Sequence, residues 1–265
     1  MKFNKYSELL TNIRIPRNYQ LPTDENVDAL NYYSDVIYSA AKFYDQISKD
    51  GLRINYAFKD NRGISVLPTK FEKGNFQHLL GIKYVGVSAT DFFNDLVNDA
   101  TPDHPLIIEK YGYAFEKLAV LDKLEKITDA DTLIITDLSK VDQAKTINFT
   151  RALRTNDRDL MLALKDFQVD LYSPRSLLNL TSERAKEKYS HVREKDCVMV
   201  YSSEKTDRGI RTNVISTNHN VEMDLSRTTE LMVAISQQAE KEFQEEEERN
   251  ILARRREAAR RGMDR

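Results

Sequence analysis

Residues 67–84 read LPTKFEKGNFQHLLGIKY, and the rest of the chain is organised around this stretch. It follows a pair of apolar runs typical of a hairpin and precedes a short amphipathic segment. Gly74 and Gly81 indicate a turn-rich window, because glycine permits backbone conformations that other residues resist. Several groups suited to proton transfer or phosphate binding gather here: His78, Asn75, Lys70, Lys73 and Lys83. We therefore expect the functional site to include this stretch.

A helix and a hairpin are predicted before this stretch. Thr23 is a suitable N-cap, and the two acidic residues after it lie where the helix dipole favours negative charge. Apolar residues then recur at helical spacing as far as Gly51, whose position is typical of a helix C-terminus. The runs 52–58 and 64–67, separated by a polar turn, predict two antiparallel strands. This order favours an α+β fold.

The patterns further along the chain predict helices packed on a mainly antiparallel β-sheet. The expected elements are helices at 89–97 and 113–127, strands at 133–138 and 160–164, a turn at 172–178, and a β-meander of strands at 197–203, 210–217 and 221–225. The composition changes near residue 226. We therefore expect an α+β domain over residues 1–225 and a charged helical tail over residues 226–265.

Composition limits the classes of function that the chain can perform. The net charge of −2 argues against a protein that coats nucleic acid through its overall field, although 40 lysines and arginines suffice for a local basic groove. The single cysteine, Cys197, lies in an apolar run and is expected to pack as a small hydrophobic residue. With one cysteine and four scattered histidines, we expect neither a metal site nor another cofactor.

The compartment predicted from the sequence is the cytoplasm. No apolar run approaches the roughly 20 residues that a transmembrane helix needs, so we expect no membrane partner. The first residues, MKFNKY, contain no continuous apolar region that would act as a signal peptide.

His78 is the main candidate for catalysis, because histidine titrates near neutral pH and can accept or donate a proton. The alternative is a histidine that merely hydrogen-bonds a neighbour near a helix. Lys70, Lys73 and Lys83 would stabilise a scissile phosphate, although lysines are most often ordinary surface residues. Asn75 either donates to a phosphate or caps the helix that follows, and capping is favoured.

A second polar group lies in residues 172–178, where Ser173, Arg175 and Ser176 surround a proline. A guanidinium flanked by hydroxyls suits a phosphate clamp, and the alternative is a turn held by the proline. The glycine-rich phosphate loops and the G-x-S-x-G and H-E-x-x-H motifs do not occur. Nucleotide-triphosphate chemistry and the hydrolase classes built on those motifs are therefore disfavoured.

The tail carries an acidic block at 245–248 followed by arginines at 254–256 and 260–261. Such charge runs are most often solvated helix. The alternatives are self-association through this helix, with acidic and basic blocks paired, and an RNA contact through the arginines.

The motif FQHLLG at 76–81, together with the strand end at 67–68 and Phe92–Phe93, resembles a known family. It is similar to the fourth group of phage-associated nuclease domains named after barnase, EndoU, colicin and RelE nucleases. The segment 172–178 and the strand after it are also similar to that group. The resemblance extends over roughly residues 25–225, and a minimal domain does not explain the long inserts between 85 and 170.

The resemblance implies helices on a four-stranded antiparallel sheet and RNA cleavage without a metal. In such a reaction an acid–base pair lets the ribose 2′-hydroxyl attack its own phosphate. His78 matches the histidine of the family motif, and Arg175 and Ser176 fall in its later polar motif. The resemblance identifies no second acid–base group.

We therefore predict a metal-independent endoribonuclease, as a toxin or a phage or mobile-element effector, with RNA and a protein inhibitor or antitoxin as partners. The predicted catalytic residues are His78, Lys83, Arg175 and Ser176, and the predicted substrate-binding residues are Lys70, Lys73, Asn75 and Ser173. The alternatives are a non-catalytic module that binds nucleic acid or protein and oligomerises through its C-terminal helix, and a structural phage protein. The sequence does not decide between RNA and DNA.

Overall fold

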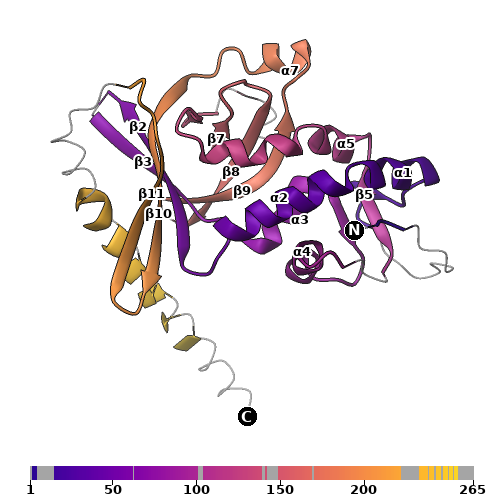
Figure 1. Cartoon of the computed structure of the whole chain (residues 1–265), viewed down its shortest axis with the longest axis horizontal. Helices are drawn as coiled ribbons and strands as arrows, with labels where there is room; N and C mark the ends of the chain where they lie inside the picture. Colours follow the sequence, from indigo (N-terminus) through magenta and orange to yellow (C-terminus); the bar gives the residue numbers. More distant parts are fainter. Residues whose placement is uncertain are drawn as a thin grey trace.

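A computed structural model describes residues 2–4, 15–61, 63–100, 104–138, 141, 149–168, 170–221 and, with single-residue gaps, 233–255. Helices and a mainly antiparallel sheet make up this part of the chain, so the predicted α+β class is confirmed (Figure 1). None of the described helices combines the length and apolar character needed to cross a membrane.

The helix predicted after Thr23 is divided into two consecutive helices. They are α1 (Asp24–Tyr32) and α2 (Ser34–Ile47). Thr23 caps α1 as expected, because its hydroxyl accepts from the backbone N–H of Asn26 and the Asn26 side chain accepts from that of Thr23. The division occurs at Tyr33, whose ψ of 3° departs from helical geometry.

The large sheet contains eight strands. In spatial order they are β11 (Gly209–Thr217), β10 (Glu194–Thr206), β2 (Leu52–Asp60), β3 (Gly63–Thr69), β9 (Leu171–Asn179), β8 (Leu160–Gln168), β7 (Arg151–Arg154) and β6 (Leu133–Ile135). The start of β10 also pairs with β6, so the hydrogen-bonded order from β10 through to β6 closes on itself. Only β3 and β9 pair in parallel among these strands. The sheet of four strands implied by the resemblance is therefore wrong.

A second, three-stranded sheet lies beside the helices. It consists of β1 (Tyr19–Gln20), β5 (Leu106–Glu109) and β4 (Ile82–Tyr84), in the order β1-β5-β4. The neighbouring helices are α3 (Lys73–Leu80), α4 (Ala89–Val97), α5 (Tyr113–Leu118) and the 3₁₀ helix η1 (Leu121–Thr128), and α7 (Glu183–Lys188) follows β9. The sequence patterns did not predict β1, β4, β5, β7 or α7.

Several sequence predictions need correction. The predicted turn at 172–178 is part of β9, because these residues pair in register with β8 along its length. The helix predicted over 113–127 is interrupted between α5 and η1. The hairpin of β10 and β11 confirms the first part of the predicted meander, while the strand expected at 221–225 lies almost entirely outside the described residues.

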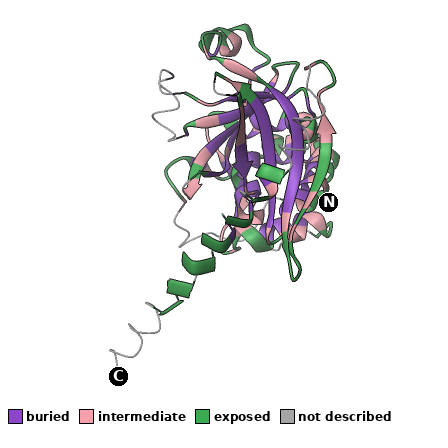
Figure 2. Cartoon of the chain, turned by 90° about the vertical axis from the view of Figure 1, so that its left-hand side faces the viewer, coloured by how far each residue is buried: buried purple, intermediate pink, exposed green. Residues whose placement is uncertain are grey.

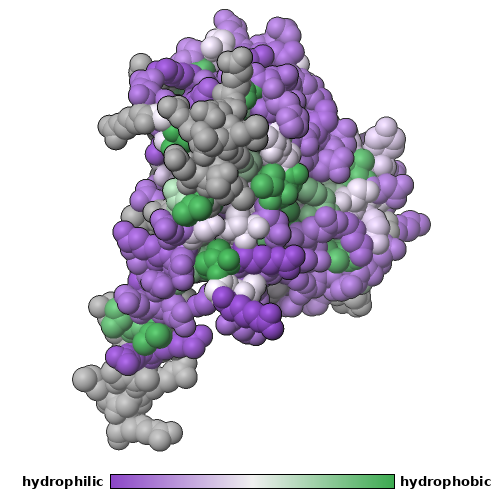
Figure 3. Space-filling model, turned by 60° about the vertical axis from the view of Figure 1, so that its left-hand side comes forward, coloured by the Kyte–Doolittle hydropathy of each residue, from purple (hydrophilic) through white to green (hydrophobic). Residues whose placement is uncertain are grey.

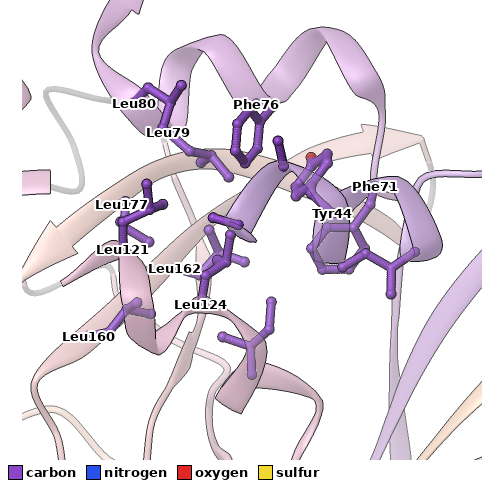
Figure 4. Packing of buried hydrophobic residues seen from close by; sticks show 14 of the residues in the cluster. Tyr44, Phe71, Phe76, Leu79, Leu80, Leu121, Leu124, Leu160, Leu162 and Leu177 are labelled. Carbon is purple, nitrogen blue, oxygen red and sulfur yellow. The ribbon is translucent and has the colours of Figure 1, made fainter. Parts of the chain in front are cut away.

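The main hydrophobic core lies between the helices and the large sheet. Tyr44 of α2 contacts Phe76 of α3 with ring centroids 5.0 Å apart, and Phe76 contacts Phe93 of α4 at 5.3 Å. Figure 4 shows Tyr44, Phe71 and Phe76 together, with leucines from the sheet and η1 beneath them. Each buried aromatic ring contributes to stability through its large apolar area. Helix α3 is therefore held firmly on one side.

The tail is helical in its described part and packs against the large sheet. Ile235, Ala239 and Phe243 are buried, and their four-residue spacing places them on one face of the helix. Ile235 packs with Ala57 of β2 and Met199 of β10. Most of this helix is coloured as exposed in Figure 2. The sequence predicted a charged helical tail with solvated charge runs, and it did not predict this packing against the sheet.

Cys197 is buried in β10, as its apolar surroundings predict. Burial raises the pKa of its thiol to about 12. At neutral pH the group is an uncharged thiol and packs as a small hydrophobic side chain.

Candidate active site around His78

Helix α3 presents His78 to solvent and buries the residues around it. Phe76, Leu79 and Leu80 are fully buried, whereas His78 is exposed. An amphipathic helix of this kind directs only one of its faces toward water. The imidazole therefore lies on the solvent-exposed face of a helix whose other face packs in the hydrophobic core.

Asn75 does not have the predicted capping role. The N-cap of α3 is Glu72, without a side-chain cap hydrogen bond. Asn75 lies inside the helix and is largely buried, with its Nδ2 3.5 Å from Glu72 Oε2. It leaves little surface for a substrate.

Gly81 ends α3 and brings Glu109 close to it. Its φ of 69° is in the left-handed region, and its N–H donates to Gln77 O at 3.1 Å. The chain then enters β4, which pairs with β5, and the N–H of Glu109 donates to Gly81 O at 2.8 Å. A Cβ on Gly81 would lie 2.8 Å from Glu109 Oε2. The absence of a side chain at Gly81 therefore makes room for this carboxylate.

Lys117 of α5 links Glu109 to the turn that carries His78. Its Nζ lies 2.8 Å from Glu109 Oε2 and donates to the backbone O of His78 at 2.8 Å. Both side chains are mostly buried, with 10% and 16% of their surface exposed. His78 O belongs to the last turn of α3, where carbonyls lack helical partners. Lys117 therefore provides a hydrogen bond to a carbonyl at the end of α3 and also neutralises the charge of Glu109.

Two residues of the small sheet complete this side of the site. Tyr19 is paired with Glu109 across β1 and β5, and its hydroxyl donates to the Glu109 carboxylate. Burial and this carboxylate raise the pKa of Tyr19 far above its ordinary value, so the phenol stays protonated. Lys83 Nζ lies over the Tyr19 ring, 4.2 Å from its centroid.

Arg175 reaches the site from the large sheet through a β-bulge. Pro174 and Ser176 oppose consecutive residues of β8, Leu164 and Ala163, so Arg175 is the extra residue of β9. A bulge redirects a side chain, and bulges are frequent near active sites. Helix α3 packs against β9, and the charge of Arg175 acts on His78.

The surroundings of His78 favour its neutral form. Partial burial of the ring lowers its pKa most, followed by the positive charges of Arg175 and Lys117, while Glu109 opposes them and Lys83 adds a smaller lowering. His78 is therefore an uncharged imidazole at neutral pH, able to accept a proton. Shifted pKa values are frequent at functional sites, which makes His78 a candidate.

The structure brings His78, Lys83 and Arg175 together and places the other predicted residues elsewhere. Lys73 pairs with Asp45 at 3.3 Å and donates to Asn94 at 3.3 Å. Ser173 is fully buried inside β9, where it has no surface for substrate contact. The Ser176 hydroxyl is also buried and lies 3.5 Å from Leu177 O.

Sequence reasoning missed three residues of the site, namely Tyr19, Glu109 and Lys117. Each belongs to a short element far from residue 78 in the sequence. The pairing of the small sheet brings Tyr19 and Glu109 together, and Lys117 joins them from α5. The one available signal was Gly81, since a helix-ending glycine indicates a close approach by another group. Within the described residues, no three histidine, cysteine or acidic side chains form a group that could hold a metal ion.

A comparison with models of known protein families gives a match. The sequence model of the family described as phage-Barnase-EndoU-ColicinE5/D-RelE like nuclease4 matches residues 36–222, well over half of the chain. The chain belongs to this nuclease family. The resemblance seen in the sequence is thereby confirmed. No curated protein and no solved structure matches the chain.

Membership in this nuclease family makes nucleic acid the substrate class of the protein. The matched region contains His78, Lys83, Glu109, Lys117 and Arg175, whereas Tyr19 precedes it. The group of charges around His78 is thus built almost entirely from the nuclease domain.

Proposed function

We propose that this nuclease cleaves RNA without a metal ion and that His78 transfers the proton. The observation that carries the proposal is the neutral, solvent-facing imidazole of His78 among three cations from three different elements: Lys83 of β4, Lys117 of α5 and Arg175 of β9. This arrangement provides a base and positive charge at one place. Those are the two requirements for attack by a ribose 2′-hydroxyl on its own phosphate.

In the proposed reaction, proton transfer to His78 accompanies attack at phosphorus. His78 takes the proton of the 2′-hydroxyl, and the 2′-oxygen forms a bond to the adjacent phosphorus. The bond from phosphorus to the 5′-oxygen breaks, and that oxygen receives a proton from water. The hydroxide so formed takes the proton from His78, which returns to its neutral form. The products are a 2′,3′-cyclic phosphate and a free 5′-hydroxyl.

Lys83 and Arg175 are proposed to stabilise the negative charge that develops on the phosphate oxygens. Arg175 suits this role because a guanidinium offers paired donors to phosphate. Lys117 is already bonded to Glu109 and to the His78 carbonyl, so its proposed role is to position His78.

The proposed biological role is that of a phage or mobile-element effector acting on cytoplasmic RNA. The phage association in the name of the family supports this role. An effector that cleaves cellular RNA needs a protein inhibitor, so an antitoxin-like partner is part of the proposal.

The test compares two oligonucleotides of one sequence, an oligoribonucleotide and its all-deoxy counterpart, in excess chelator. Cleavage of the ribose form alone, with 2′,3′-cyclic phosphate ends, is the expected result. Cleavage of both forms would contradict 2′-hydroxyl attack, and activity restored only by added divalent metal would contradict metal independence. Binding of RNA without cleavage under any condition would favour the non-catalytic module.

A further inference from the structure

Two tyrosines with exposed rings lie together in the turn that joins β5 to α5 (Figure 1). Tyr111 has 85% of its surface exposed and Tyr113 has 59%, and no other large apolar or aromatic residue described by the structure is as exposed as Tyr111. The ring centroids are 6.1 Å apart, with an angle of 72° between the ring planes. Rings left in water contribute little to stability. The needs of the fold therefore do not explain this pair.

Most of the other exposed large apolar residues lie on β11 and on the C-terminal helix: Val214, Ile215, Val233, Ile251 and Leu252. Figure 3 views this side of the molecule, where the hydrophobic residues form separate patches on a mostly hydrophilic surface. Small separate patches of this kind are normal on a folded protein. The tyrosine pair differs from them because its two rings are aromatic, contact each other and belong to a turn next to the His78 site.

The backbone at Tyr111 is strained. Its φ is 60° and that of Gly112 is 76°, and the N–H of Tyr113 donates to Lys110 O at 3.3 Å. Positive φ at both central residues is typical of a type I′ turn, in which glycine, asparagine and aspartate predominate. A tyrosine is unfavourable there because its Cβ crowds the backbone. Strain of this kind is concentrated at functional sites.

The turn is fixed to the elements around it. On one side, the N–H of Lys110 donates to Asn18 O at 3.0 Å. On the other side, Ala114 and Leu118 of α5 are buried in the main core. The exposed rings are therefore carried by a backbone that is held in place, and a ligand that binds them pays little for ordering the turn.

The end of α3 lies next to this turn. A Cβ on Gly81 would be 3.2 Å from the Cα of Ala114, the residue after Tyr113. Lys117, which donates to His78 O at 2.8 Å, follows Tyr113 by one helical turn and lies on the same face of α5. These contacts place the Cα atoms of Tyr113 and His78 roughly 15 Å apart at most. A few nucleotides of one strand cover that distance.

We propose that Tyr111 and Tyr113 stack on bases of a single-stranded RNA, a few nucleotides or fewer from the phosphate at His78. The proposal rests on the proposed function, since it takes the strand at His78 to be RNA. Every base has a flat aromatic face, so stacking on a tyrosine holds a strand without selecting its sequence. The two tyrosines are positioning residues, because they hold the strand and do not touch the reacting atoms.

The test is fluorescence anisotropy of the full chain with a labelled single-stranded 2′-O-methyl oligoribonucleotide, which lacks the free hydroxyl needed for cleavage. Tyr111→Asn is the decisive variant, because asparagine tolerates the left-handed backbone and cannot stack as a tyrosine does. We expect it to weaken binding about 5- to 150-fold while the thermal unfolding midpoint stays equal or rises. Tyr113→Ala should weaken binding in the same range. Neither variant should change the slope of log affinity against log salt, because an uncharged ring releases no counterions.

Two matched controls separate stacking from other effects. Tyr111→Phe and Tyr113→Phe keep the aromatic ring and remove only the hydroxyl, so both should bind RNA as the wild type does. An oligonucleotide of the same length that lacks its bases should bind equally to the wild type and to Tyr111→Asn, because it offers nothing to stack on.

Three results would overturn the proposal. The first is equal RNA affinity in the wild type, Tyr111→Asn and Tyr113→Ala, which would favour a protein partner for these rings. The second is a loss of affinity in the phenylalanine variants as large as that in Tyr111→Asn. The third is a lower unfolding midpoint in Tyr111→Asn, which would show that Tyr111 serves the fold. Because the probe cannot be cleaved, absence of nuclease activity would contradict the proposed function and leave a positive stacking result intact.

Discussion

Partial burial lowers the pKa of His78 most, and the three cations and one carboxylate around it shift the pKa further. Positive charge makes a protonated imidazole less favourable, and the Glu109 carboxylate does the reverse. The lowered pKa means that His78 loses its proton at a lower pH than an ordinary histidine. A rate that depends on neutral His78 should therefore rise with pH below about 6.5 and level off above it.

Two substitutions should shift this titration in opposite directions. Arg175→Gln removes the charge with the largest effect on His78, so its pKa should rise toward the ordinary value. Glu109→Gln removes the opposing charge, so the pKa should fall further. The ring proton of His78, followed by NMR across the pH range, measures both shifts without any need for nuclease activity. Shifts of the same sign in the two variants would contradict the electrostatic account.

Helix α3 was largely predictable from the sequence, and the site at its end was not. The pattern of buried Phe76, Leu79 and Leu80 around polar His78 indicates both the helix and its exposed face. By contrast, β1, β4 and β5 contain two to four residues each, which is too few to show the alternation of apolar and polar residues that indicates a strand. The contact of Lys117 with His78 joins residues 39 positions apart. Such a contact depends on the fold and not on a local pattern.

The end of α3 gives a prediction at the scale of the element. Gly81→Ala places a Cβ 2.8 Å from Glu109 Oε2 and 3.2 Å from the Cα of Ala114, in addition to the strain of a positive φ. Gly112→Ala is the matched control, because Gly112 has a φ of 76° and nothing within 4 Å of the added atom.

The control isolates the cost of left-handed backbone, about 1–2 kcal/mol for a residue with a Cβ. Gly81→Ala should lose a further ~1–3 kcal/mol from the forced contacts. Urea denaturation of both variants measures the difference in unfolding free energy. Equal losses would show that the Glu109 carboxylate is not held against Gly81.

The molecule as a whole combines a nuclease domain with a C-terminal helix that packs on its sheet. Apolar residues at four-residue spacing in the tail were visible in the sequence, but the acidic and basic blocks beside them favoured a solvated helix. The structure shows Ile235, Ala239 and Phe243 buried against the sheet. The alternating strand patterns predicted the β10–β11 hairpin. The closure of the sheet through β6 and β10 joins distant segments and had no local signature.

Packing of the tail should be measurable by amide hydrogen exchange. Ile235→Asp places a charge against Ala57, Met199 and Tyr201, where burial of an unpaired carboxylate is unfavourable. Exchange at the described helical residues between 233 and 255 should become faster, while amides of α3 keep their protection. Val233→Asp is the control, since Val233 is 52% exposed. Equal exchange in the two variants would contradict docking of the tail through Ile235.

The central claim is that His78 transfers the proton in RNA cleavage, and one measurement tests it directly. Wild type, His78→Ala and the control His104→Ala, which removes an exposed histidine before β5, are compared for initial rates of RNA cleavage in excess chelator. Circular dichroism verifies that each variant is folded. We predict that His78→Ala lowers the rate by about 10²–10⁴-fold and that His104→Ala leaves it unchanged. Full activity in folded His78→Ala would contradict the claim.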